Sequence, residues 1–175
     1  RNLCSNTQSI VSYLGLTETD RVMAVLPFYY VYGKTLLNTH FMVGGSVVIN
    51  NRFAFPNAVV KEMADREVTG FSGVPSTFAI LMNRSIFTKT VIPSLRYVTQ
   101  AGGAMAPALT RRLIDHLGSV PLFVMYGATE ASARLTYLPP HRLVRDKLGS
   151  IGIPIPGVDI TVRDDAGNEL PDGVV

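Results

Sequence analysis

At the centre of this sequence stands Leu122-Phe123-Val124-Met125-Tyr126-Gly127-Ala128-Thr129-Glu130-Ala131-Ser132. An apolar run that stops at an aromatic residue, a glycine, a hydroxyl and a carboxylate predicts a buried strand followed by a polar turn. In open α/β sheets, ligands bind beyond the carboxyl ends of the strands. The turn after residue 126 is therefore the first candidate site.

The residue types in this turn suit a nucleotide phosphate accompanied by Mg²⁺. Gly127 lets backbone approach a ligand, Thr129 offers a hydroxyl to an anionic oxygen, and Glu130 offers a hard oxygen to a divalent cation. Tyr126 presents a flat apolar face that suits an aromatic base. Taken alone, the same five-residue pattern also fits a plain strand-to-turn junction with a capping threonine and an exposed glutamate.

Strand-like and helix-like segments alternate on the amino-terminal side of this stretch. Short apolar segments predict strands at 22–26, 46–50, 69–72 and 96–100, and helical spacing predicts helices at 3–14, 56–68, 76–83 and 107–117, with another ending near residue 42. This alternation is typical of a three-layer α/β/α fold, with a mostly parallel sheet covered by helices on both faces. After the central stretch we expect small edge strands near 134–138, 151–156 and 158–162, and an irregular surface loop over 139–149.

Composition and charge exclude several classes of protein. The chain has 175 residues, 47% of them hydrophobic and 17% charged, which is a globular composition for one domain. A net charge of +3 without long basic runs argues against a nucleic-acid partner, and no apolar run is long enough to be a transmembrane segment. The single cysteine, Cys4, excludes an internal disulfide and fits a cytoplasmic location. His40, His116 and His141 are scattered, which argues against a zinc site.

The central motif resembles the core motif of the adenylate-forming (AMP-binding) superfamily, which includes acyl- and aryl-CoA synthetases, firefly luciferase and adenylation domains. Further stretches resemble landmarks of that family in the same order, and together they span nearly the whole chain. They are Leu26-Pro27-Phe28-Tyr29-Tyr30-Val31-Tyr32-Gly33, Val74-Pro75-Ser76-Thr77, Ala101-Gly102-Gly103-Ala104-Met105 and Gly149-Ser150-Ile151-Gly152-Ile153-Pro154-Ile155-Pro156-Gly157.

The resemblance implies activation of a carboxylic acid with ATP and Mg²⁺. An acyl-adenylate and pyrophosphate would form first, and the acyl group would then pass to coenzyme A or to a carrier-protein thiol. The enzyme's main task would be to neutralise charge and align two anions. By resemblance, Glu130 holds the metal and Thr129 the phosphate as the catalytic pair. The residues that border the nucleotide are Gly103, Ala104, Met105, Tyr126, Gly127, Ala128 and Thr129, and those that shape the acid pocket are Tyr30, Tyr32, Gly33, Gly102 and Met125.

Some of these assignments have structural alternatives. The aromatic cluster around Tyr30 also fits simple core packing, and the glycines at 102 and 103 also fit a tight turn that needs a positive φ angle. Relatives often have histidine where Tyr30 stands. Amino-acid-activating relatives carry an aspartate shortly after the position of Phe28, and this chain has only aromatic and apolar residues there. A fatty or aryl acid is therefore favoured.

The sequence also departs from the family in what it lacks. The phosphate loop that precedes residue 1 in relatives is missing, and so are the ribose-binding aspartate, the hinge and the catalytic lysine of the small mobile domain. We therefore expect residues 1–175 to be one subdomain of a longer enzyme, inactive alone. Two alternative hypotheses are a non-catalytic binding domain with the same fold, and an unrelated dinucleotide-dependent oxidoreductase. The intact Thr129 and Glu130 argue against the first, and the absence of a glycine fingerprint argues against the second.

Overall fold

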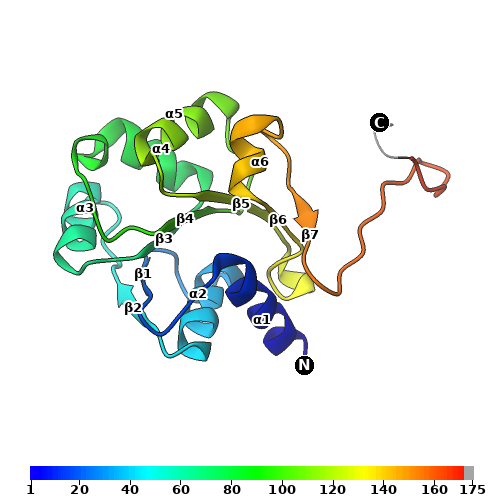
Figure 1. Cartoon of the computed structure of the whole chain (residues 1–175), viewed down its shortest axis with the longest axis horizontal. Coiled ribbons are helices and arrows are strands. Elements are labelled where there is room, and N and C mark those ends of the chain that lie inside the picture. Colours follow the sequence, from blue (N-terminus) through cyan, green and yellow to red (C-terminus); the bar gives the residue numbers. More distant parts are fainter. Residues whose placement is uncertain (172–175) are drawn as a thin grey trace.

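A computed structural model, which describes residues 1–171, contains one mixed sheet of seven strands in the order β2-β1-β3-β4-β5-β6-β7 (Figure 1). Strands β2, β1, β3, β4 and β5 run parallel to their neighbours, and β6 and β7 are antiparallel additions at one edge. The predicted three-layer α/β fold with a mostly parallel sheet is thus confirmed.

The elements follow the expected alternation along the chain. The strands are β1 (Arg21–Ala24), β2 (Ser46–Ile49), β3 (Gly70–Gly73), β4 (Tyr97–Gln100), β5 (Leu122–Tyr126), β6 (Thr136–Leu138) and β7 (Ile153–Pro154). The helices are α1 (Asn2–Leu14), α2 (Val31–Met42), α3 (Pro56–Asp65), α4 (Pro75–Arg84), α5 (Pro107–Leu117) and α6 (Pro140–Arg145), with the short 3₁₀ turns η1 (Phe87–Lys89) and η2 (Thr129–Ala131).

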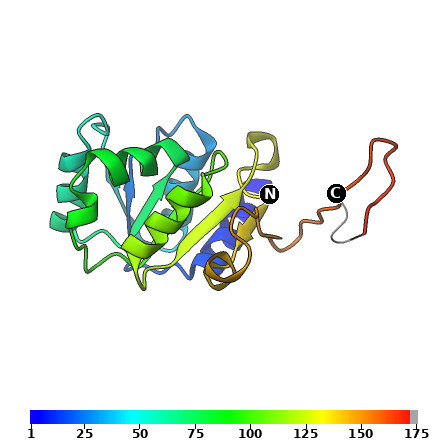
Figure 2. The same ribbon diagram turned by 90° about the horizontal axis from the view of Figure 1, so that it is seen from above.

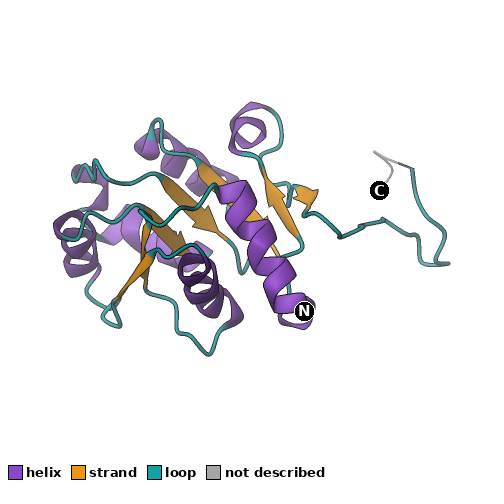
Figure 3. Cartoon of the chain, turned by 60° about the horizontal axis from the view of Figure 1, so that its bottom comes forward, coloured by secondary structure: helices purple, strands orange, loops and turns teal. Residues whose placement is uncertain are grey.

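Each face of the sheet packs against its own set of helices (Figures 1 and 3). Helices α3, α4, α5 and α6 cover one face, and their buried side chains form one hydrophobic cluster around Phe71 and Val98. Helices α1 and α2 cover the other face, with Ile10, Leu36 and Phe123 in a second cluster. Because helices cover both faces, all residues of β3 and β4 are buried, including the polar Ser72, Thr99 and Gln100.

Local sequence signals set most of the helix ends. Helix α1 ends where Gly15 adopts the left-handed conformation, at a φ of 59°. Proline stands in the first turn of α3, α4, α5 and α6, where its missing N–H costs no hydrogen bond. The expectations for 3–14 and 107–117 are confirmed to within a residue, whereas α3 stops at Asp65, before the predicted end at residue 68.

Two expectations for the carboxyl-terminal third are wrong. Residues 140–145 form helix α6, although a surface loop was expected, because Leu143 is only 2% exposed and anchors the segment in the core. Residues 158–162 form no strand; they lie in an extended tail that leads away from the sheet (Figure 2), and the nearest pairing is an isolated bridge between Arg163 and Glu169. The tail has no neighbouring strand with which to form a ladder, and a strand requires a partner.

A network of polar groups links the amino-terminal ends of β1, β3 and β4, which we call the amino-terminal edge of the sheet. The Asp20 carboxylate accepts hydrogen bonds from the Arg96 guanidinium at 2.7 and 3.0 Å and from the Thr69 hydroxyl at 2.8 Å. His40 donates through Nδ1 to the Leu36 carbonyl at 2.9 Å, so its Nε2 accepts from the Tyr97 hydroxyl at 2.8 Å. Within residues 1–171, no helix has the length and hydrophobicity that a membrane span requires.

Candidate functional site

The carboxyl ends of β4 and β5 border a cavity of about 490 Å³. Its wall is formed by the loop after β4, the end of β5, the first half of α5, and the segment after α6. The lining residues are Gln100, Gly102, Gly103, Ala104, Met105, Pro107, Thr110, Val124, Met125, Tyr126, Gly127, Leu143, Gly149, Ser150 and Ile151. All the residues assigned to the nucleotide up to Gly127 lie here, together with two of the acid-pocket residues. The structure therefore brings most of the predicted set into one hollow.

The loop after β4 is a glycine turn held by a buried amide. Gly102 and Gly103 have φ angles of +79° and +152°, which favour glycine. The Gln100 side chain, 2% exposed, donates from Nε2 to the Gly103 carbonyl at 2.8 Å and so closes the turn. A Cβ on Gly102 would lie 2.6 Å from the Tyr30 hydroxyl. The two glycines thus allow the positive φ angles of the turn and leave room for the ring of Tyr30. Gln100 stabilises the turn, and the sequence alone assigned it no role.

The chain reversal that follows β5 requires a glycine at position 127. A Cβ at this position would overlap the Ala133 carbonyl, because the chain reverses through η2 and passes directly beside it. Ser132 and Ala133 complete the reversal with positive φ angles. The returning backbone is then held by Asn6 of α1, which donates to the Arg134 carbonyl at 2.7 Å and accepts from the Arg134 N–H at 3.2 Å.

Thr129 and Glu130 lie outside the 490 Å³ cavity, on the exposed turn η2. Glu130 instead lines a smaller neighbouring hollow of about 190 Å³, which it shares with Asn2 and Ser5 from the first turn of α1. Arg134 lines the same hollow, but no ion pair joins it to Glu130, because the single ion pair among residues 1–171 is that of Arg96 with Asp20. The polar pair therefore stands at the rim between the cavity and the start of α1.

The acid-pocket residues from the α2 region differ in what they contact. Tyr30 directly precedes α2, and the centre of its ring lies 6.4 Å from the centre of the Tyr32 ring in an edge-on arrangement. Tyr32 is buried, and its hydroxyl pairs with Thr99 at 2.6 Å. Gly33 faces the backbone of Pro27, where a Cβ would overlap the carbonyl oxygen. Gly33 thus packs α2 against the preceding loop and does not line the 490 Å³ cavity.

A residue that the sequence analysis did not single out lies beside these tyrosines. Arg134 is only 2% exposed, and its guanidinium carbon stands 5.2 Å from the centre of the Tyr32 ring. Burial raises the pKa of Tyr13 to about 12, an effect that the charge of Arg134 partly opposes. Burial likewise raises the pKa of Tyr32, and Arg134 again opposes it. Both phenols therefore stay neutral beside the cation. A lone arginine shortly after a polar turn gave no periodic signal by which the sequence could have identified it.

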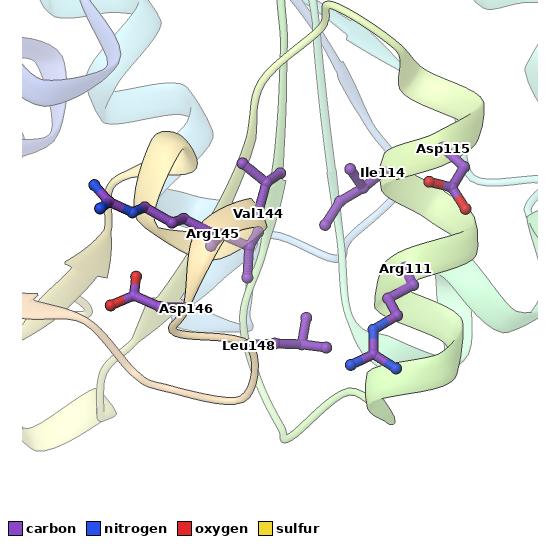
Figure 4. Close-up of a pocket in the computed structure, with 8 residues that line it drawn as sticks. Arg111, Ile114, Asp115, Val144, Arg145, Asp146 and Leu148 are labelled. Carbon is purple, nitrogen blue, oxygen red and sulfur yellow. The ribbon is translucent and has the colours of Figure 1, made fainter.

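Figure 4 shows another hollow, of about 570 Å³, between α5 and the end of α6. Ile114 and Leu148 point into the space between the two elements, whereas Asp115 and Arg145 point away from it. None of the predicted site residues lines this hollow. We therefore take the cavity at the strand ends as the candidate site.

The described part of the chain has no cluster of three or more histidine, cysteine or acidic side chains that could hold a metal. A single exposed carboxylate, such as that of Glu130, still fits Mg²⁺, because this ion is usually held by one or two carboxylates together with substrate phosphates and water. The donor set at the rim thus suits a metal that arrives with a nucleotide, and not a resident metal centre.

The family model described as "AMP-binding enzyme" matches residues 1–175, the whole chain. The chain belongs to the AMP-binding enzyme family. It is 32% identical over 175 residues to the long-chain-fatty-acid–CoA ligase of Yersinia pestis, covering 97% of this chain and 30% of that ligase. The resemblance of the central motif to adenylate-forming enzymes is confirmed.

Solved structures agree with this membership. The o-succinylbenzoate-CoA synthetase of Bacillus subtilis in complex with ATP and a magnesium ion superposes with a TM-score of 0.82 at 28% identity, over 97% of this AMP-binding chain and 34% of the synthetase. The amide bond synthetase McbA of Marinactinospora thermotolerans gives a TM-score of 0.88 at 26% identity, over 99% and 34% of the two chains. This AMP-binding chain thus spans about a third of the length of the relatives that it matches.

Proposed function

We propose that this chain is the central part of an enzyme that activates a carboxylic acid with ATP and passes the acyl group to coenzyme A. The observation that carries the proposal is the placing of Thr129 and Glu130, exposed and without a basic partner among the described residues, at the rim of a cavity at the strand ends. Membership of the AMP-binding family and the relatives named as CoA ligases support it. The reaction brings two anions together, and a metal ion held by such a carboxylate would neutralise part of their charge.

Each part of the rim has a role in this reaction. An oxygen of the acid attacks the α-phosphorus of ATP and displaces pyrophosphate, giving the acyl-adenylate. Tyr126 and the backbone of residues 103–105 form the walls of the base site, and the Thr129 hydroxyl donates to a phosphate oxygen. Glu130 would hold Mg²⁺, which supplies positive charge to the phosphate oxygens during the displacement. In the second step the coenzyme A thiol attacks the acyl carbon and AMP leaves.

The acid is a fatty or aryl acid in this proposal. The segment around Phe28 and Tyr30 is aromatic and apolar, and the described α2 region presents no carboxylate that could hold an amino acid's ammonium group. The relatives' names cover a range of acids, from long-chain fatty acids to 2-succinylbenzoate. Because the chain spans only about a third of those relatives, we propose that residues 1–175 alone do not catalyse the reaction.

The proposal is tested by ATP–pyrophosphate exchange with the longer protein that contains this chain, across fatty, aryl and amino acids. We expect exchange that depends on a fatty or aryl acid and falls at least about 100-fold in Glu130→Gln, because a carboxylate that holds a metal at the reacting phosphates is lost. Glu18→Gln, an exposed glutamate at the opposite edge of the sheet, is the matched control and should leave exchange unchanged. A folded protein that shows no exchange with any acid would contradict the proposal and favour a binding domain.

A further inference from the structure

The 490 Å³ cavity at the strand ends is lined without any charged side chain. The polar side chains among its lining residues are those of Gln100, Thr110, Tyr126 and Ser150. Such a lining suits a neutral ring, because a phosphate or carboxylate in the cavity would lose its hydration without gaining a counter-charge. The charged part of a nucleotide therefore belongs at the rim, near Thr129 and Glu130, and the cavity itself is left for the base.

Most of these polar side chains already have local partners or lie exposed. The Thr110 hydroxyl donates to the Ala106 carbonyl at 3.2 Å within α5, and the Ser150 hydroxyl accepts from the Gly152 N–H at 3.1 Å. Tyr126 is 45% exposed. Gln100 differs from all three, because it carries a buried carboxamide with both a donor and an acceptor.

The orientation of the Gln100 carboxamide is fixed by the loop after β4. The residue is 2% exposed and stands beside Val124 in the sheet register. Its Nε2 donates to the Gly103 carbonyl at 2.8 Å. Because a carbonyl oxygen can only accept a hydrogen bond, the nitrogen of the carboxamide must face the loop and Oε1 must face away from it.

The outward atom, Oε1 of Gln100, is an acceptor without a donor among the described residues. It is also not enclosed by protein, since the one fully buried side-chain nitrogen or oxygen without a partner among residues 1–171 is the Nε of Arg134. Because Gln100 lines the cavity, its oxygen opens into that space. A ligand that excludes water there must offer a donor, or it leaves this acceptor unsatisfied at a cost in free energy.

We propose that Gln100 selects adenine by accepting a hydrogen bond from the amino group of the base. A carboxamide can hold adenine at two points, and the second N–H of Nε2 remains for the adjacent ring nitrogen. A base with a carbonyl oxygen in place of the amino group would bring two acceptors together. The inference rests on the proposed acid-activating function and deepens it: the faces of the base site stack on any purine, whereas Gln100 distinguishes ATP from other purine nucleotides.

The test measures pyrophosphate exchange into three nucleoside triphosphates, using the longer protein and a single fatty or aryl acid that it activates. Carbon 6 of the purine bears an amino group in ATP, hydrogen in purine riboside triphosphate and oxygen in ITP. In the wild-type protein we expect kcat/KM for ATP to exceed that for purine riboside triphosphate by about 30-fold, because the buried acceptor loses its donor. The value for ITP should be lower still, since its oxygen would face the Gln100 oxygen.

Two substitutions separate recognition of the base from support of the turn. Gln100→Leu removes the acceptor and the donor to Gly103, so the preference for ATP over purine riboside triphosphate should fall to within about threefold, mainly by raising KM for ATP. Gln100→Glu keeps an acceptor oxygen, ionised or protonated, but loses the amide N–H, so exchange should fall with every nucleotide while the preference remains. Thr110→Val, an isosteric change in the same cavity, is the matched control and should leave the preference unchanged.

The outcomes separate this inference from the function on which it rests. Equal exchange with ATP and purine riboside triphosphate in the wild-type protein, or a preference that survives in Gln100→Leu, overturns the inference and leaves the proposed function standing. Loss of the preference in Gln100→Glu or in Thr110→Val does the same, because the preference would then depend on the turn or on the hydroxyl. Exchange with no nucleotide and no acid overturns both. If Gln100→Leu does not fold, Gln100→Met takes its place, since methionine has a similar length and only a weakly accepting sulfur.

Discussion

Polar residues lie at both ends of the parallel strands, but they are paired differently at the amino-terminal ends (the amino-terminal edge) and at the carboxyl-terminal ends (the carboxyl-terminal edge). At the amino-terminal edge, the Asp20 carboxylate is paired with Arg96 and Thr69, and both ring nitrogens of His40 have partners. At the carboxyl-terminal edge, Glu130 has no ionic partner in the described chain. Arg134, at the same edge, is buried with its Nε unpaired.

This contrast distinguishes polar groups that stabilise the folded state from polar groups that are available to bind a ligand. Internal pairing satisfies buried groups and stabilises the folded state. Polar groups left without partners cost stability, and they persist where a bound molecule completes them. Changes at the amino-terminal edge should therefore alter stability and leave chemistry intact, whereas changes at the carboxyl-terminal edge should do the reverse.

The largest effect is expected at Glu130. In Glu130→Gln we expect exchange to fall by about 100- to 1000-fold, because the metal and the phosphate charge lose their carboxylate. The midpoint of thermal unfolding should stay within about 1 °C of wild type, since substitutions at exposed sites rarely change stability. Exchange and thermal melts on the same preparation measure both. A variant that lost stability along with activity would break the division between the two edges.

For Asp20→Asn we expect the opposite result, a loss of stability without a loss of exchange. The amide keeps the shape of the side chain but removes the charge that Arg96 and the Thr69 hydroxyl require. We expect a loss of about 3 kcal/mol in the free energy of unfolding, measured in urea, because the buried carboxylate loses the charge that accepts hydrogen bonds from the partly exposed Arg96 and from Thr69. Exchange per folded molecule should not change. Asp65→Asn, at an exposed position on α3, is the control and should stay within about 0.5 kcal/mol of wild type.

A change of packing beneath the amino-terminal network should have a smaller effect. A Cβ on Gly70 would overlap the ring of Tyr97, whose hydroxyl donates to His40. Overpacking of this kind costs about 1–3 kcal/mol, so Gly70→Ala should destabilise the fold by about 2 kcal/mol. Gly15→Ala is the comparison, because a Cβ there meets nothing within 4 Å and tests only the positive φ angle. It should cost about 1 kcal/mol, and equal losses in the two variants would remove the packing explanation.

The smallest effect is the response of stability to acid. Burial lowers the pKa of His40 below its ordinary value of 6.5, so the unfolded chain binds this proton more tightly than the folded chain does. Stability should therefore fall as the pH drops below about 6.5. His116, whose pKa burial also lowers, contributes in the same direction.

Asp20 adds to this loss at lower pH. Burial raises its pKa, but the hydrogen bonds from Arg96, Thr17 and Thr69 outweigh this, so the folded value lies below the ordinary 3.8. Its contribution is present above that ordinary value and is lost as the pH falls through the folded one. Urea unfolding at a series of pH values measures both steps. In His40→Gln the free energy of unfolding should fall less steeply with pH in the first step than in wild type. An unchanged slope in that variant would show that His40 does not cause this step.

Much of the fold was predictable because it depends on local patterns. The spacing of apolar residues located α5, and Gly15 marked the end of α1. Helix α6 was missed because Leu143 gives no periodic signal within six residues, and only its burial against the rest of the core orders that segment. The strand expected at 158–162 failed for the opposite reason, because a local β pattern forms no strand without a neighbour.

The sequence by itself determined the α/β alternation, the parallel sheet and the family, because apolar periodicity and the order of short motifs are written along the chain. It also named Tyr126, Gly127, Thr129 and Glu130 as one polar turn. Only the tertiary structure decided that Asn6 holds the turn from 128 residues away and that Arg134 is buried without a carboxylate. The physical reason is that burial and pairing depend on distances between segments far apart in sequence, and these distances exist only once the sheet has assembled.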